Sequence, residues 1–182
     1  ENRYTINSVL NKKFNARFNL RSGTTIELFD LDATNQDRDR RINIPDSNND
    51  GIPDYFISNR CIDESFILGQ LFSQGEYKFS DELSFTLGLH AQYMDYTNDL
   101  AIEPRSAISW QFRPNQRLSV AYGLHSQMIP LPILLLTQTN ENGNSIATNE
   151  DLEFMRSHHF VLGYDRSIGN NWRVKAETYY QN

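Results

Sequence analysis

The sequence contains only one cysteine, Cys61, among 182 residues. A disulfide within this sequence and a cysteine-based zinc cluster are therefore both excluded. It also contains no apolar stretch near the roughly 20 residues that a membrane-spanning helix requires. The most apolar run, MIPLPILLL at residues 128–136, is short and interrupted by two prolines. Apolar spacing with a period of about 3.6 residues, which predicts amphipathic helices, is nearly absent.

The charge balance is mildly acidic, with a formal net charge of −6. This argues against nucleic acid as a partner, because binding to a phosphate backbone requires clustered Lys and Arg. Hydrophobic residues make up only 38%, yet aromatic residues reach 12%, with nine Tyr and eleven Phe. So many strand-favouring aromatic residues predict a folded, β-rich chain and not a disordered one.

Alternation of apolar and polar residues with a period of two is the dominant pattern. It predicts eight strands, at residues 3–11, 16–33, 63–79, 83–97, 103–112, 117–127, 156–167 and 172–181. Strands in soluble proteins cluster near about 5–6 residues, whereas a transmembrane β-strand needs about 9–11. The lengths therefore favour strands that cross a membrane.

The connections between these strands alternate in length. Short turns are predicted at residues 12–15, 80–82, 113–116 and 169–171, and longer links at residues 34–62, 98–102 and 128–155. Outer-membrane barrels have this order because their periplasmic turns are short and their extracellular loops are long.

The two faces of the predicted strands differ in polarity, although strand 63–79 is less regular, with Phe66, Leu68 and Phe72 on its polar side. Alternation alone does not distinguish a lipid-facing sheet from a half-buried soluble one. Aromatic residues near the short turns favour lipid, since Trp and Tyr suit the membrane interface: Tyr77, Phe79, Trp110, Phe112, Tyr164 and Trp172. Isolated charges within the polar faces fit a hydrated lumen: Arg17, Arg21, Glu27, Glu76, Lys78, Arg173, Lys175 and Glu177.

Two long stretches resemble the barrel of TonB-dependent outer-membrane receptors. They are PRSAISWQFRPNQRLSVAYGLHSQ at residues 104–127 and RSHHFVLGYDRSIGNNWRVKAETYYQ at residues 156–181. The preceding EYKFSDELSFTLGLHAQYMDYTND is similar to a hairpin of the same barrels. The resemblance covers residues 63–181 well and residues 1–34 more loosely.

The resemblance implies an all-β fold: an antiparallel up-and-down transmembrane β-barrel segment of about eight strands, with short periplasmic turns and long extracellular loops. Residues 1–182 are then expected to be part of one outer-membrane β-barrel domain, with the plug domain and the remaining strands outside the sequence. Barrels of this family have 22 strands and a plugged lumen. Eight strands can also close alone, but the fragment is the preferred interpretation.

The function implied is active uptake of a scarce ligand, of the siderophore, cobalamin or glycan class, across the bacterial outer membrane. The expected partners are outer-membrane lipid, the inner-membrane TonB complex acting through the absent plug, and an unknown small-molecule or glycan ligand. Two alternatives stay open: a soluble or surface-attached β-rich calcium-binding or adhesion module, and a passive porin-like barrel.

One loop has the spacing of a calcium site. Asp46, Asn48, Asp50 and Asp54 place oxygens at positions 1, 3, 5 and 9, with glycine at position 6, as in the first part of an EF-hand loop. Position 12, which needs a bidentate Glu, is Ile57. A solvated turn rich in Asp, Asn and Gly also explains this spacing, and any Ca²⁺ site here is expected to be weak and structural.

The remaining reactive residues predict no catalytic or transition-metal site. His90, His125 and His159 are expected on the polar face and His158 on the other, without ligand-type spacing. No G-x-S-x-G, H-E-x-x-H or P-loop motif is present. Ser126 adjoins His125, but adjacent strand residues face opposite ways, so the protein is not expected to be an enzyme. The run at residues 128–136 is expected either to contact ligand in the barrel mouth or to pack against neighbouring loops.

Overall fold

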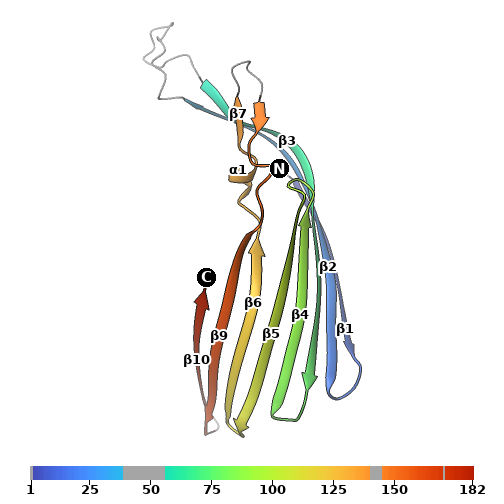
Figure 1. Ribbon diagram of the computed structural model, residues 1–182, viewed down its shortest axis with the longest axis vertical. Coiled ribbons are helices and arrows are strands. Elements are labelled where there is room, and N and C mark those ends of the chain that lie inside the picture. Colours follow the sequence, from blue (N-terminus) through green and yellow to red (C-terminus); the bar gives the residue numbers. More distant parts are fainter. Residues whose placement is uncertain (1, 39–55, 140–144, 170) are drawn as a thin grey trace.

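The computed structural model describes residues 2–38, 56–139, 145–169 and 171–182. Eight of its strands form one antiparallel sheet in the order β1-β2-β3-β4-β5-β6-β9-β10 (Figure 1). Because neighbours in the sheet are also neighbours along the chain, this is the predicted up-and-down meander. The strands are β1 (Asn2–Lys13), β2 (Phe18–Arg38), β3 (Phe56–Lys78), β4 (Leu83–Met94), β5 (Asp99–Arg113), β6 (Gln116–Gln127), β9 (Met155–Ile168) and β10 (Trp172–Gln181).

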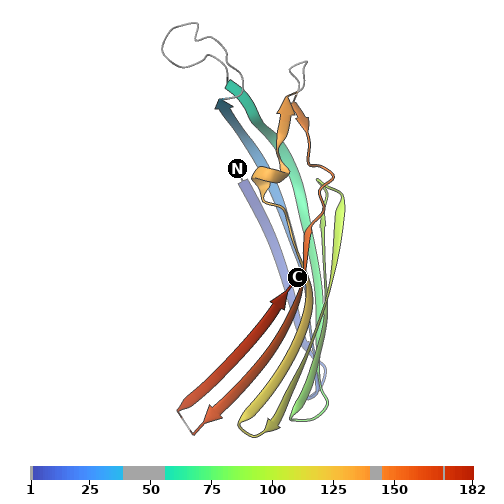
Figure 2. The same ribbon diagram turned by 60° about the vertical axis from the view of Figure 1, so that its left-hand side comes forward.

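The sheet is a curved, open wall and does not close on itself (Figure 2). Within the described residues, β1 and β10 are its two edges and do not pair with each other. All residues of both edge strands are exposed. These eight strands therefore form a segment of a wall and not the small closed barrel that the same number of strands could make.

The short turns lie together at one end of the sheet, as predicted (Figure 1). Side chains close two of them: Asn15 Oδ1 accepts hydrogen bonds from the amides of Arg17 and Phe18, each at 2.8 Å. Ser80 Oγ accepts from the amides of Glu82 and Leu83 at 3.2 and 3.1 Å. Between β9 and β10, Gly169 has a φ of +60°, which a residue without Cβ adopts freely.

The connections at the opposite end differ from the prediction. The link expected at residues 98–102 is a tight turn at residues 95–98, so the predicted alternation of short and long connections is wrong there. Asn98 makes this turn possible by adopting a φ of 53°, which Asn tolerates better than most residues. The loop expected at residues 34–62 is shorter, because β2 and β3 continue as a paired ladder to Arg38 and Phe56.

The long link between β6 and β9 contains structure that the sequence did not predict. It holds the four-residue helix α1 (Leu131–Leu134) and a small hairpin of β7 (Thr137–Thr139) and β8 (Ser145–Ala147). Pro130 begins the helix, and its carbonyl accepts hydrogen bonds from the amides of Ile133 and Leu134. None of the helical segments in the described residues has the length and hydropathy needed to span a bilayer.

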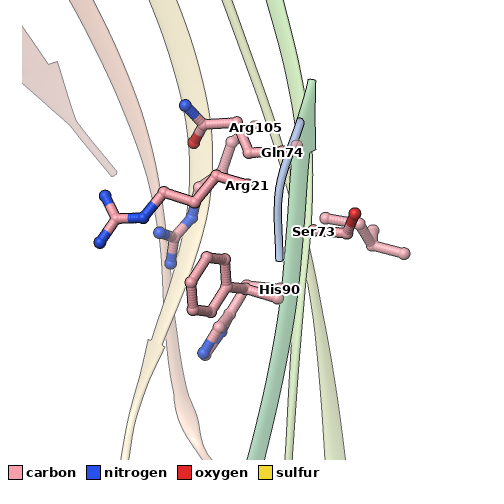
Figure 3. A pocket seen from close by; sticks show the side chains of 8 residues that line it. Arg21, Ser73, Gln74, His90 and Arg105 are labelled. Carbon is pink, nitrogen blue, oxygen red and sulfur yellow. The ribbon is translucent and has the colours of Figure 1, made fainter. Parts of the chain in front are cut away.

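The predicted division of the sheet into two faces is present. We call the face that carries Arg21, Gln74, His90 and Arg105 the lumen face, and the opposite one the outer face (Figure 3). Large apolar residues stand exposed on the outer face, each with 38–62% of its surface accessible: Ile26, Leu28, Ile67, Leu71, Leu87, Leu89, Ile102, Ile108, Trp110, Val120, Phe160, Leu162 and Val174.

The upper lumen face, away from the short turns, carries an apolar cluster that we call the mouth core. Phe29 of β2 and Phe66 of β3 stack there with ring centroids 4.8 Å apart, and Leu134 of α1 packs on the cluster and is fully buried. This covering explains why Phe66 and Leu68 of β3 interrupt the polar alternation, whereas Phe72 lies outside the cluster. The buried members are Phe29, Leu31, Phe66, Leu68, Met94, Ala101, Leu134, Leu135 and Phe154.

Candidate functional site

A buried carboxylate lies on the lumen face just below the mouth core. Glu103 of β5 is only 1% exposed. Its Oε1 accepts hydrogen bonds from Gln92 Nε2 and from the amide of Ser126, each at 3.1 Å, and from the Ser126 hydroxyl. Its Oε2 accepts from Arg105 Nη2 at 2.6 Å. These donors compensate for the high cost of burying a charged group.

This carboxylate joins two strands where their backbone pairing stops. The ladder between β5 and β6 ends at the pair Arg105–Gly123, although both strands continue beyond it. The Ser126 amide, which would otherwise face β5 without a partner, donates to Glu103. Gln92 Nε2 also donates to the Ser126 carbonyl at 3.0 Å, which adds β4 to the same connection. Glu103 therefore fixes the end of β6, from which the chain leaves to form the mouth core.

A shallow hollow of about 230 Å³ lies next to this cluster on the lumen face. Arg21, Gln74, His90 and Arg105 project into it from β2, β3, β4 and β5, whereas Ser73 points to the outer face (Figure 3). The Arg21 guanidinium lies 5.7 Å from the centroid of the Phe72 ring, which also lines the hollow. The arrangement gathers cationic and neutral hydrogen-bond donors from four adjacent strands at one place.

The histidines lie on the predicted faces. His90 Nδ1 is 3.1 Å from Glu103 Oε2, and the rings of His125 and His159 meet edge to face with centroids 4.6 Å apart. On the outer face, the Tyr122 hydroxyl is hydrogen bonded to His158 Nδ1 at 3.0 Å. Within the described part of the chain, no group of three or more His, Cys, Asp or Glu side chains could hold a metal ion.

Charged pairs continue along the lumen face on both sides of the hollow. Arg3 pairs with Glu27 at 2.5 Å near one edge. Near the other edge the Arg173 guanidinium donates to both carboxylate oxygens of Asp165, and Lys175 Nζ lies 2.7 Å from Glu177 Oε1. Four of the charges expected to line a polar lumen, Glu27, Arg173, Lys175 and Glu177, are thus paired across or along the strands.

The calcium residues predicted from the sequence, Asp46, Asn48, Asp50 and Asp54, lie outside the described residues. The expectation that Ser126 points away from the lumen is wrong, because its hydroxyl contacts Glu103. The contact forms because the β5–β6 ladder has ended at Arg105–Gly123, so the Glu103 side chain reaches the Ser126 amide and hydroxyl, while β6 keeps its register with β9.

Sequence reasoning missed the role of Glu103. The signal was available: odd-numbered residues of its strand share the polar face, so Glu103 and Arg105 are neighbours on that face. What the sequence could not supply was the contact with Gln92 and Ser126, since this depends on where the pairing of β5 and β6 ends.

The sequence matches the profile described as "TonB dependent receptor-like, beta-barrel" over residues 1–182. No curated protein sequence matches the chain. Crystal structures of mutants of the ferric enterobactin receptor PfeA from Pseudomonas aeruginosa are similar in fold. One is 18% identical with a TM-score of 0.67, and another, in complex with enterobactin, is 18% identical with a TM-score of 0.63.

In both comparisons the alignment covers 98% of this chain and 26% of the receptor. The chain therefore spans about a quarter of the length of these receptors. At such low identity the structural likeness supports the fold alone, and it agrees with the open eight-stranded meander. The profile match extends over the whole sequence, and the chain belongs to the family of TonB-dependent receptor β-barrels.

Proposed function

We propose that the chain is part of the barrel wall of an outer-membrane receptor that takes up a scarce ligand with energy from the TonB complex. The observation that carries this proposal is the match to the receptor barrel family over residues 1–182. The exposed apolar outer face supports it, since a bilayer is the surrounding that stabilises such a face. The polar lumen face with its charged pairs suits a hydrated interior.

In this function the extracellular end captures the ligand. The mouth core places residues 128–135 over the lumen face, where an incoming ligand would meet them. The ligand is expected to belong to the siderophore, cobalamin or glycan class. The partners are outer-membrane lipid and, through the plug domain expected in the complete receptor, the inner-membrane TonB complex.

The test is energy-dependent uptake by cells that express the complete gene product. We expect accumulation of a radiolabelled ferric siderophore, cobalamin or oligosaccharide that disappears when the host lacks TonB. A passive porin-like barrel, the alternative function, would instead admit its solute equally well with and without TonB. Equal uptake in the two hosts would therefore overturn the proposal in favour of the porin.

Calcium binding by Asp46, Asn48, Asp50 and Asp54 is proposed separately, from the spacing of their oxygens. If the loop binds Ca²⁺, the melting temperature of the complete protein should rise with added Ca²⁺ and fall again with a chelator. The Asp50→Ala variant should lose this response. A response that persists in this variant would place the ion elsewhere.

A further inference from the structure

The connection between β6 and β9 lies folded on the wall. We call its described residues, 128–139 and 145–154, the strap. After leaving β6, the strap crosses the lumen side of β5 and β4 and reaches β3, which β7 contacts (Figure 1). Met94 of β4 and Ala101 of β5 are buried in the same cluster as Leu134 of the strap. The strap therefore spans the wall from β6 to β3 and narrows the space on its lumen side.

Both ends of the strap are attached to one strand. At its start, the amide of Ser126 donates to Glu103 of β5 at 3.1 Å. At its end, the amide of Phe154 donates to Asp99 Oδ2 at 2.7 Å, and Arg156 Nη2 lies 3.7 Å from the other oxygen of the same carboxylate. Asp99 is the first residue of β5. Two carboxylates of β5 thus hold the two points at which the strap joins the sheet.

The middle of the strap is packed against the wall and closed on itself. Leu134, Leu135 and Phe154 are 0%, 2% and 4% exposed, so three of the nine buried residues of the mouth core come from the strap. The amide and the hydroxyl of Thr148 donate to the carbonyl of Leu136 at 3.3 and 3.0 Å, which ties the two branches of the strap together. Segments that open readily have few buried apolar contacts, and the strap has the opposite construction.

We propose that the strap is a fixed constriction of the receptor's entrance, seated on the wall before any ligand arrives, and not a lid that stands open in the free receptor. The term entrance rests on the proposed function, whereas the seating of the strap does not. A lid would have to expose the mouth core and take the Phe154 amide away from Asp99 each time it opened. The backbone also disfavours a hinge, since the described strap has no glycine and includes Pro130 and Pro132, whose rings fix φ. A ligand then has to pass on the side of the strap that faces away from the wall.

The test is thiol labelling of the complete protein in detergent, without ligand, by a maleimide too polar to enter an apolar core. Each variant carries a single cysteine, with Cys61 and any other native cysteine replaced by serine. Ile133→Cys and Leu134→Cys compare neighbours that are 53% and 0% exposed. We expect Leu134→Cys to react at least about a hundredfold more slowly, because a fixed strap leaves its open state populated at about 1% or less. A lid that stands open would allow both cysteines to react at similar rates.

Hydrogen exchange of the unmodified protein tests the same point without a substitution in the core. The amides of Leu134 and Leu135 donate to the carbonyls of Pro130 and Leu131. We expect these amides to exchange at rates within about tenfold of those at residues 124–127 of β6, because one buried cluster holds both segments. An open lid would exchange far faster than the end of β6.

The attachment at Asp99 has a matched control beside the same turn. Asp99→Ala removes the acceptor of the strap's Phe154 amide. It should speed up the labelling of Leu134→Cys about tenfold, the loss expected for one hydrogen bond to a charged group. Asp95 Oδ1 accepts instead from the amide of Ile67 in β3 at 2.7 Å, so Asp95→Ala should leave the strap unchanged.

Exchange of the strap much faster than that of residues 124–127 would overturn the inference, as would an equal effect of Asp95→Ala and Asp99→Ala. Fast labelling of Leu134→Cys would do the same unless exchange of the unmodified protein stays slow. In that case the substitution itself has loosened the core, and the inference stands. None of these measurements uses a ligand or TonB, so failure of the fixed strap is distinguishable from failure of the proposed uptake.

Discussion

The lower and upper parts of the wall are built from the same strands but differ in which of their faces are apolar. In the lower part, apolar side chains such as Leu87 face outward, while the lumen face carries charged pairs. In the upper part the lumen face is apolar as well: Phe66 is 2% exposed, whereas Ile67, the next residue, is 43% exposed on the outer face. The lower wall therefore has one apolar face and the upper wall has two.

The difference shows that one strand can carry lipid-facing residues on one face and residues of a protein core on the other. Outer-face residues need the bilayer, since the described residues leave them exposed. Residues of the mouth core are covered by the chain itself, through α1 and the segment that follows β6. Changes in the mouth core should therefore cost stability in detergent and lipid alike. The stability cost of changes on the outer face should differ between detergent and lipid.

The largest effect is expected where the two parts meet, at Glu103. Glu103→Ala leaves Gln92, Arg105 and the Ser126 amide without their buried acceptor. Removing one partner of a buried ionic network typically costs about 3–5 kcal/mol. Denaturant unfolding of the complete protein in detergent should show this loss. Hydrogen exchange of residues 124–136 should accelerate more than that of residues 105–123.

The conservative variant separates the hydrogen bonds from the charge. Glu103→Gln keeps an oxygen that can accept from Gln92 and Ser126 but loses the ion pair with Arg105. We therefore expect a smaller loss of unfolding free energy than in Glu103→Ala, and less accelerated hydrogen exchange at residues 124–136. Asp165→Ala, which breaks a carboxylate–Arg pair of the same face opposite Arg117, near the start of β6 and away from its end at Gln127, is the matched control. Equal acceleration of exchange at residues 124–136 in the control would contradict the role given to Glu103.

A core substitution on the loop side tests whether the upper wall is held by protein contacts. Leu134→Ala should cost about 2–5 kcal/mol, the range for truncating a buried Leu, because Leu134 is 0% exposed. Its neighbour Ile133 is 53% exposed, and Ile133→Ala should change the free energy of unfolding much less. Similar losses for the two variants would mean that α1 does not pack on the lumen face.

A charge on the outer face tests the lower wall. Leu87 lies near the middle of β4 and is 58% exposed. Leu87→Arg should cost about 2–4 kcal/mol if the residue faces the middle of the bilayer. The loss should appear in unfolding from lipid vesicles, and Thr86→Arg, on the lumen face of the same strand, should be mild. If Thr86→Arg were the more damaging variant, the two faces would have to be exchanged.

The fold was predictable because lipid imposes a regular pattern. Every strand of the main sheet was found, and Leu87, Trp110 and Val174 lie on the face that alternation assigned to them. The mouth core was not predictable in the same way, since Phe66 and Leu68 obey no period of two with their polar neighbours. Their role depends on Leu134 and Phe154, which are distant in sequence and reach them only through the path of the chain after β6.

The candidate site was predictable only in its parts. Arg21 and His90 were expected on the polar face, and the structure places them there. Their gathering around one hollow depends on the registers of the β2–β3, β3–β4 and β4–β5 pairs, which align residues from four strands. Alternation gives the face of each residue, but it does not give the height at which residues of different strands meet.

The smallest effect is expected at Tyr96, in the turn between β4 and β5, which packs against the mouth core. Burial raises the pKa of the Tyr96 hydroxyl, and Glu150 and Glu64 raise it further. The pKa of this hydroxyl is higher in the folded state than the value of about 10 in the unfolded state. Its contribution to stability is therefore fully present below about pH 10, where the hydroxyl is neutral in both states. That contribution should be lost as the pH rises above about 10 and through the raised pKa. Thermal unfolding from pH 8 to 11 should therefore show a shallower alkaline loss of stability in Tyr96→Phe, and an unchanged loss would mean that Tyr96 does not titrate against the mouth core.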